Sequence, residues 1–124
     1  MKRIVIKIED LEIEAELNDS QTARLIYERL PFKSKVNLWG DEIYFKIPIK
    51  TGLEKDFSKD EVLIGDLGYW PEGACFCIFF GLTPISKPGK ILPASKVNLI
   101  GRISGSYEEF KKVKEGSIIT IEKR

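Results

Sequence analysis

Hydrophobic and charged residues alternate at the start of the chain with the two-residue period of a β-strand that has one buried face. Two such runs, at residues 4–8 and 11–17, are separated by a two-residue turn, which predicts a β-hairpin. In this register Lys7 lies opposite Glu12 on a charged outer face, an ion pair that helps to set the register.

After residue 17 the spacing of the hydrophobic residues changes to that of a helix. Ala23, Ile26 and Leu30 recur at helical spacing behind a polar segment that ends with Ser20, a residue type that caps helix N-termini. The helix is expected to stop before Pro31, because a residue preceding proline avoids the helical conformation. Its hydrophobic side should lie on the sheet.

Strict alternation returns at residues 42–49. The row expected to face the core consists of Ile43, Phe45, Ile47 and Ile49. Glu42, Tyr44 and Lys46 lie on the opposite face, so aromatic and charged groups stand together there. We therefore predict a buried first row and a more accessible second one.

Residues 75–80, CFCIFF, are hydrophobic on both faces, so both sides of this strand should be covered. Residues 82–95 contain three prolines and a glycine, which predicts an ordered loop of a length that is often functional. The remaining predicted elements are strands at 36–38, 67–70, 97–103 and 117–121, a loop at 50–61 and a short helix at 107–113.

Many strands with two short helices favour a closed β-barrel capped by helices, in which no strand edge is exposed. An open α+β sandwich is the alternative. With 124 residues, the chain is expected to form a single domain over residues 1–124.

Composition narrows the possible partners. Lys and Arg number 20 against 19 for Asp and Glu, so no basic field exists to bind nucleic acid. Charged residues interrupt the N-terminal segment too soon for a signal peptide, and no hydrophobic run approaches the ~20 residues that a membrane span requires, so we expect a cytoplasmic protein with no membrane partner. The abundance of Ile, Lys and Glu beside a single Gln is typical of a thermophile.

The chain contains no histidine, which removes the commonest metal ligand and general base and every nucleophile arrangement that depends on one. Cys75 and Cys77 point to the same face of one strand and are poorly placed to bridge each other. We expect buried thiols, no metal and no organic cofactor.

Four segments in the same order resemble the small prokaryotic proteins that carry a cyclophilin-like fold. They read VNLWGDEIYFKIPI, IGDLGYWPEGACFCIFFG, LTPIS and LPASKVNLIGRISG. With the predicted helix they cover most of the chain. The resemblance implies a mainly β protein, a closed eight-stranded barrel capped by two short α-helices, with a concave site on the outer face of the barrel.

The likeness to true peptidyl-prolyl isomerases is more distant. Lys46 stands near the place of their central arginine, Phe45 replaces the neighbouring histidine, and residues 50–56 lack their Gln-Gly-Gly-Asp stretch. Lysine offers a mobile point charge where arginine offers a rigid fork of donors. The resemblance therefore covers the scaffold better than the chemistry.

The candidate ligand-binding residues are Trp39, Glu42, Tyr44, Lys46, Trp70, Phe79, Phe80 and Ser95. Aromatic residues serve binding surfaces and cores equally well, and one of Phe79 and Phe80 should face the interior. Glu42 is a candidate binding or acid–base group, while Ser95, with Pro93 and Ala94, belongs to the expected lip of the site. Lys46 would be catalytic only in an isomerase.

These observations predict a protein that binds a small molecule or a short proline-containing peptide in an aromatic-lined groove. One alternative is a weak or atypical peptidyl-prolyl cis-trans isomerase that uses Lys46 or a backbone donor. A second is an interaction module whose aromatic face is buried in a homodimer.

Overall fold

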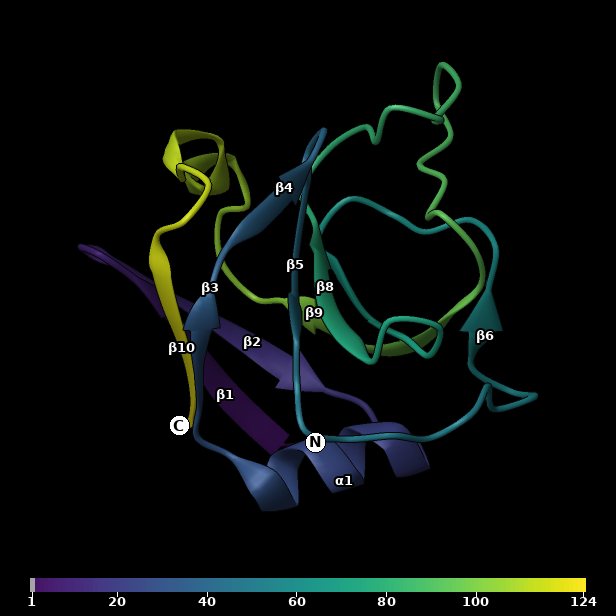
Figure 1. Cartoon of the computed structure of the whole chain (residues 1–124), viewed down its shortest axis with the longest axis horizontal. Coiled ribbons are helices and arrows are strands. Elements are labelled where there is room, and N and C mark those ends of the chain that lie inside the picture. The colour runs from purple at the N-terminus through teal and green to yellow at the C-terminus, as the bar shows by residue number, and fades with distance from the viewer. Residues whose placement is uncertain (1) are drawn as a thin grey trace.

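The computed structural model describes residues 2–124 as one antiparallel sheet that curls around a hydrophobic interior (Figure 1). Its strands are β1 (Lys2–Ile8), β2 (Leu11–Leu17), β3 (Phe32–Lys35), β4 (Asn37–Trp39), β5 (Glu42–Lys46), β6 (Ser58–Lys59), β7 (Asp66–Trp70), β8 (Cys75–Phe79), β9 (Val97–Ile103) and β10 (Ile118–Lys123). The helical elements are α1 (Gln21–Arg29) and the 3₁₀ turn η1 (Glu108–Lys112).

Nine strands follow one another in the order β3-β10-β1-β2-β9-β7-β8-β5-β4, and the short β6 pairs with β9 beside this path. Its two ends, β3 and β4, are joined in the chain by the buried residue Val36, so the barrel is nearly closed. The expectation of eight strands is wrong. Residues 32–39 form two strands instead of the single one expected, because FKSK pairs with β10 although its alternation is weak.

The ends of the barrel also differ from the two α-helices expected. Helix α1 lies across one end, where the Ser20 hydroxyl accepts the Ala23 amide at 3.0 Å and the helix stops before Pro31. The second predicted helix is the single 3₁₀ turn η1, anchored by the buried side chain of Phe110. With only one buried residue in this segment, packing supports one turn rather than a longer helix.

The first hairpin has the predicted register, with Lys7 opposite Glu12. Lys7 nevertheless forms its ion pair on the other side, with Glu122 of β10 at 3.0 Å. On the half of the sheet formed by β1, β2 and β10, the inner face is hydrophobic and most outer side chains are charged.

The other half of the sheet is covered on both faces, as the sequence of β8 predicts. Phe76 and Ile78 point into the barrel, whereas Cys75, Cys77 and Phe79 belong to a second, smaller hydrophobic cluster on the outside.

The predicted core row of residues 43–49 is buried, although β5 itself ends at Lys46. On the opposite face Lys46 is exposed and Tyr44 is half-buried, as predicted, but Glu42 is buried, so the expected accessibility of this second row is wrong at Glu42. The residues of the core row are Ile43, Phe45, Ile47 and Ile49, all at most 5% exposed.

Candidate functional site

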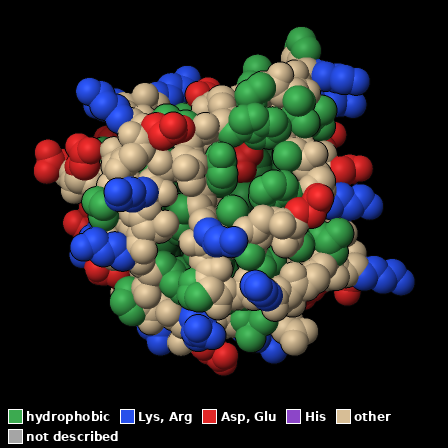
Figure 2. Space-filling model, viewed as in Figure 1, with side chains coloured by type: hydrophobic (Ala, Val, Ile, Leu, Met, Phe, Trp, Pro, Cys, Tyr) green, Lys and Arg blue, Asp and Glu red, His purple; other side chains and the backbone are tan. Residues whose placement is uncertain are grey.

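A pocket of about 290 Å³ opens on the outer face of the sheet, over β4, β5 and β7 and under the segment that leads into β9. Its lining consists of Trp39, Glu42, Tyr44, Trp70, Pro93, Ala94 and Val97. Figure 2 shows an acidic group recessed among hydrophobic side chains on this face. The lining is thus hydrophobic and aromatic around a single ionisable carboxyl group, as in many small-molecule sites.

Strand register brings these side chains together. Trp39 pairs with Glu42, and Glu42 pairs with Phe79, so the three lie in one row across β4, β5 and β8. Tyr44 lies two residues further along β5, opposite Cys77. Directly paired residues project from the same face of a sheet, which is why an alternating strand builds one side of the pocket.

The floor of the pocket depends on Gly68 in β7. A Cβ at this position would lie 3.1 Å from Val97 and 3.3 Å from the ring of Phe79, closer than ordinary contact. The missing side chain lets Val97 and Phe79 approach the sheet. Phe79 is consequently fully buried below the pocket rather than exposed within it.

Trp70 is held in place from two sides. Its ring lies against Gly73, where a Cβ would come within 2.6 Å of the indole. Its Nε1 donates a hydrogen bond to the Ser95 hydroxyl at 2.6 Å, and that hydroxyl donates to the carboxylate of Glu72. Ser95 therefore fixes the indole and links residues 82–95, the covering loop of the pocket, to β7.

The covering loop is ordered by its own hydrogen bonds. The Ser86 hydroxyl accepts the amides of Thr83 at 2.9 Å and of Leu92 at 3.0 Å, and the Thr83 hydroxyl donates to the Leu92 carbonyl. Ser86 thus has a structural role in shaping the loop whose far end, at Pro93, lines the pocket.

Glu42 is the one ionisable carboxyl of the pocket, and it is only 6% exposed. Burial raises its pKa to about 7, and the contact with the Cys77 thiol only partly opposes this rise. Among the described residues, no Lys or Arg forms an ion pair with Glu42. The group is held at a depth where a charge is costly unless a partner arrives.

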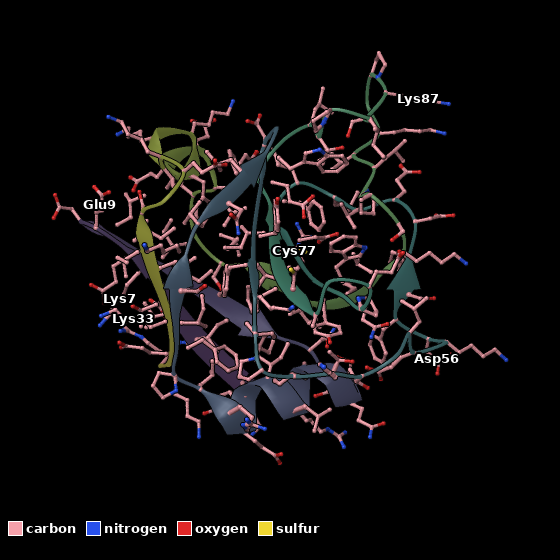
Figure 3. All side chains as sticks on the ribbon, in the orientation of Figure 1. Lys7, Glu9, Lys33, Asp56, Cys77 and Lys87 are labelled. Carbon is pink, nitrogen blue, oxygen red and sulfur yellow. The ribbon has the colours of Figure 1, made fainter. Side chains whose placement is uncertain are left out.

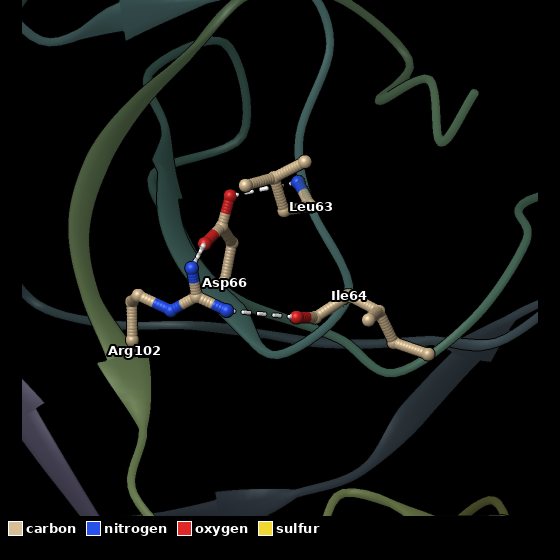
Figure 4. Close-up of polar contacts among 4 residues, drawn as sticks. All are labelled: Leu63, Ile64, Asp66 and Arg102. Atoms are coloured by element: carbon tan, nitrogen blue, oxygen red, sulfur yellow. Dashed lines mark hydrogen bonds and ion pairs between the residues drawn. The ribbon is translucent and has the colours of Figure 1, made fainter. Parts of the chain in front are cut away.

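Asp66, on the same outer face of β7, is a buried acid with its partners in place (Figure 4). It accepts the Leu63 amide at 2.8 Å and faces the guanidinium of Arg102 at 3.7 Å. Burial raises the pKa of Asp66, while these two contacts oppose the rise. Asp66 is a structural acid, whereas Glu42 lacks comparable partners.

Cys77 lies in the middle of this face on β8 (Figure 3). Burial, together with the nearby Glu42, raises the pKa of its thiol well above the ordinary value, so Cys77 stays protonated and unreactive. Both cysteines are buried and free, as predicted. Within residues 2–124, no group of three or more Cys, Asp or Glu side chains is placed to hold a metal ion.

The structure brings together most, but not all, of the predicted site residues. Those that line the pocket are Trp39, Glu42, Tyr44 and Trp70, while Ser95 and Phe79 support it.

Phe80 lies on the opposite face, inside the barrel, 5.8 Å from the ring of Phe110, and we remove it from the candidate site. Lys46 is exposed and is not part of the lining. Val97, which sequence reasoning treated only as part of a strand, joins the lining because Gly68 admits it.

Comparison with known proteins identifies the family. The family model described as cyclophilin-like matches residues 2–122, and the chain therefore belongs to the cyclophilin-like family. It is similar to the solution structure of the hypothetical protein AF2241 from Archaeoglobus fulgidus, with 43% sequence identity and a TM-score of 0.82 over 99% of this chain and 95% of that one. Among curated proteins no match was found. No helix within the described part of the chain is long and hydrophobic enough to cross a membrane.

Proposed function

We propose that this protein binds one small, mainly hydrophobic molecule in the pocket between β5, β7 and the covering loop, with Glu42 meeting the polar group of that molecule. The observation that carries this proposal is the carboxyl of Glu42, 6% exposed and without an ion-pair partner among residues 2–124, at a pocket lined by aromatic rings. A buried acid of this kind lowers stability, and such costs are concentrated at functional sites.

A prolyl isomerase is less well supported. Isomerisation without covalent chemistry needs a donor beside an apolar pocket for the proline ring. Lys46 is exposed and lies outside the lining, and the charged group inside the pocket, Glu42, is an acceptor when ionised. The pocket is therefore better suited to holding a ligand than to polarising a peptide bond.

The two tryptophans provide a direct test of binding. Trp39 and Trp70 are the only tryptophans of the chain, and both line the pocket. In a set of neutral, cationic and anionic fragments observed by NMR, we expect binders to shift the two indole N–H signals together with the backbone amide signals of residues 94–97. Shifts that gather elsewhere, or indole signals that no fragment moves, would contradict the proposal.

Ala94→Phe should block the pocket while leaving Glu42 and both tryptophans in place. Ala94 is exposed at the mouth, so a larger side chain there meets no packed core. Ala94→Ser, which barely changes the size, is the matched control. We expect the fragment-induced shifts to disappear in the first variant and to persist in the second.

Homodimerisation is the second candidate function, supported by a separate observation. Leu63, Leu82 and Ile85 are each about half exposed or more, at 62%, 49% and 49%. The aromatic face itself is covered by the chain's own loop, so a dimer would use these residues beside it instead. Sedimentation of the wild-type protein and of Leu63→Lys tests this; a monomer at all concentrations would exclude it.

A further inference from the structure

Three aromatic residues and one buried carboxyl share the pocket. Trp39, Tyr44 and Trp70 supply two indoles and a phenol, and Glu42 supplies the only ionisable carboxyl of the lining. The lining contains no Lys or Arg. Taken together, these residues offer a ligand π-faces and one negative charge and no cationic group.

We propose that the ligand is an organic cation, an alkylated ammonium group whose charge is balanced by the Glu42 carboxylate and whose alkyl groups contact the rings of Trp39, Tyr44 and Trp70. This inference rests on the proposed function, since it names the chemical class of the molecule that the pocket binds.

The aromatic rings favour such a cation for a physical reason. A positive charge near an aromatic ring is attracted by the negative face of the π-system, most strongly by indole, and aromatic cages bind quaternary ammonium groups in this way. The Trp70 N–H is already donated to Ser95, so this residue offers a ligand its ring rather than its donor. A quaternary ammonium needs no hydrogen-bond acceptors for N–H groups, which suits a pocket with few polar atoms.

The charge of Glu42 selects against the other classes of ligand. An anion would meet a buried carboxylate with no compensating Lys or Arg in the lining. A neutral molecule would leave that carboxylate desolvated and unpaired when it is ionised. A cation supplies the partner that Arg102 provides for Asp66 on the same face of the sheet.

The volume favours a small cation over a peptide segment. At about 290 Å³ the pocket lies at the lower end of the range for ligand sites. A choline-sized group is therefore a suitable probe, whereas a peptide would have to extend over the exposed rim.

The decisive experiment compares choline with 3,3-dimethyl-1-butanol, which has the same shape but carbon in place of the charged nitrogen. Binding is measured at pH 8 by fluorescence and by the indole N–H signals of the full chain. We expect choline to bind at least about tenfold more tightly than the neutral isostere, since a desolvated cation–π contact and an ion pair both depend on the charge.

Glu42→Gln keeps the shape of the side chain and removes the charge, so we expect it to abolish most of the preference for choline. Glu12→Gln, which neutralises an exposed glutamate on β2, is the matched control and should leave the preference unchanged. If Glu42→Gln does not fold, the comparison of the two probes on the wild-type protein still decides the question.

The outcomes separate this inference from the proposed function. Equal binding of choline and its isostere, or binding of neutral fragments but not of choline, would overturn the organic-cation inference and leave a binding pocket of another specificity. Indole signals that neither these probes nor any other fragment moves would overturn both.

Discussion

The two halves of the sheet treat their outer faces in opposite ways. In β1, β2 and β10 most outer side chains are charged and in contact with solvent, as in the Lys7–Glu122 pair, whose side chains are 43% and 38% exposed. In β5, β7 and β8 the outer face, apart from the exposed Lys46, is covered by loops and is mainly hydrophobic. One sheet thus combines an ordinary solvated surface with a second, smaller core that contains the pocket.

The comparison also applies to acids. On the charged half, Glu122 and Glu14 stay at the surface and pair with basic residues. On the covered half, Glu42 is buried without such a partner, and Asp66 is buried with one. A carboxylate on the charged half of the sheet is stabilised by water. A carboxylate on the covered half has lost that water and needs a cationic partner instead.

The largest effect should come from truncating a ring of the second core. Phe79→Ala removes a side chain with no exposed surface, and we expect a loss of about 3–5 kcal/mol in the free energy of unfolding. Phe76→Ala, on the opposite face of the same strand, is the matched comparison. Urea unfolding should give similar losses for both; a loss below about 1 kcal/mol for Phe79→Ala would mean that the outer face is not packed as a core.

The second prediction concerns Glu42→Gln. The pKa of Glu42 is about 7 in the folded protein against 4.5 for the free side chain, so between these values the folded state holds a proton that the unfolded state has lost. Stability from this group is therefore highest below pH 4.5 and falls as the pH rises towards 7, by about 3 kcal/mol in all. Glu42→Gln should be more stable than the wild type at pH 8, by up to that amount, and nearly equal to it at pH 4.

The exposed Glu12→Gln variant is the control for this profile and should follow the wild type at both pH values. Urea titrations at pH 4 and pH 8 measure the difference. If Glu42→Gln were less stable than the wild type at pH 8, the carboxylate would have a stabilising partner in the protein, and the contrast with Asp66 would not hold.

Local patterns predicted the strands well where the burial of one face or of both faces is visible in neighbouring residues. The first hairpin, the alternation of β5 and the two-sided covering of β8 all follow from residues next to each other in the chain. The division of residues 32–39 into two strands does not, because β3 exists through its pairing with β10, more than eighty residues later. Helix α1 shows the same limit: Ser20 predicts its start, but Glu54, which accepts the amides of Gln21 and Thr22, comes from a distant loop.

The candidate site shows the same division between residues that a local pattern predicts and contacts that depend on distant segments. Glu42 and Tyr44 follow from alternation, since they stand on the face opposite a clear core row, whereas Trp39 joins them through its cross-strand pairing with Glu42. The depth of Glu42 does not follow, because it depends on the loop that covers this face. Phe79 and Phe80 could not be distinguished without the register that pairs Phe79 with Glu42.

Ser95→Ala should have a smaller effect, confined to the link between the covering loop and β7. The substitution removes the hydroxyl that accepts the Trp70 N–H, and we expect a loss of about 1 kcal/mol in stability. Because the indole is then held only by its packing against Gly73, its fluorescence should shift and fragment binding should weaken. Ser104→Ala, at an exposed position away from the pocket, is the control.

The smallest effect is expected for Lys46→Ala, and it tests the enzyme alternative. Lys46 is exposed, so its loss should change stability by less than about 0.5 kcal/mol and leave fragment binding unaltered. Prolyl isomerisation of a standard peptide should be undetectable, or far below cyclophilin rates, in the wild type, because no arginine-like donor faces the pocket; a missing donor of this kind costs about two to three decades of rate. Lys46→Arg is the matched variant and should stay inactive, since its side chain starts from the same exposed position. If the wild type isomerised the peptide at ordinary cyclophilin rates and Lys46→Ala abolished this activity, the outer face of β5 would be catalytic, and its difference from the solvated half of the sheet would have to be explained by catalysis instead of binding.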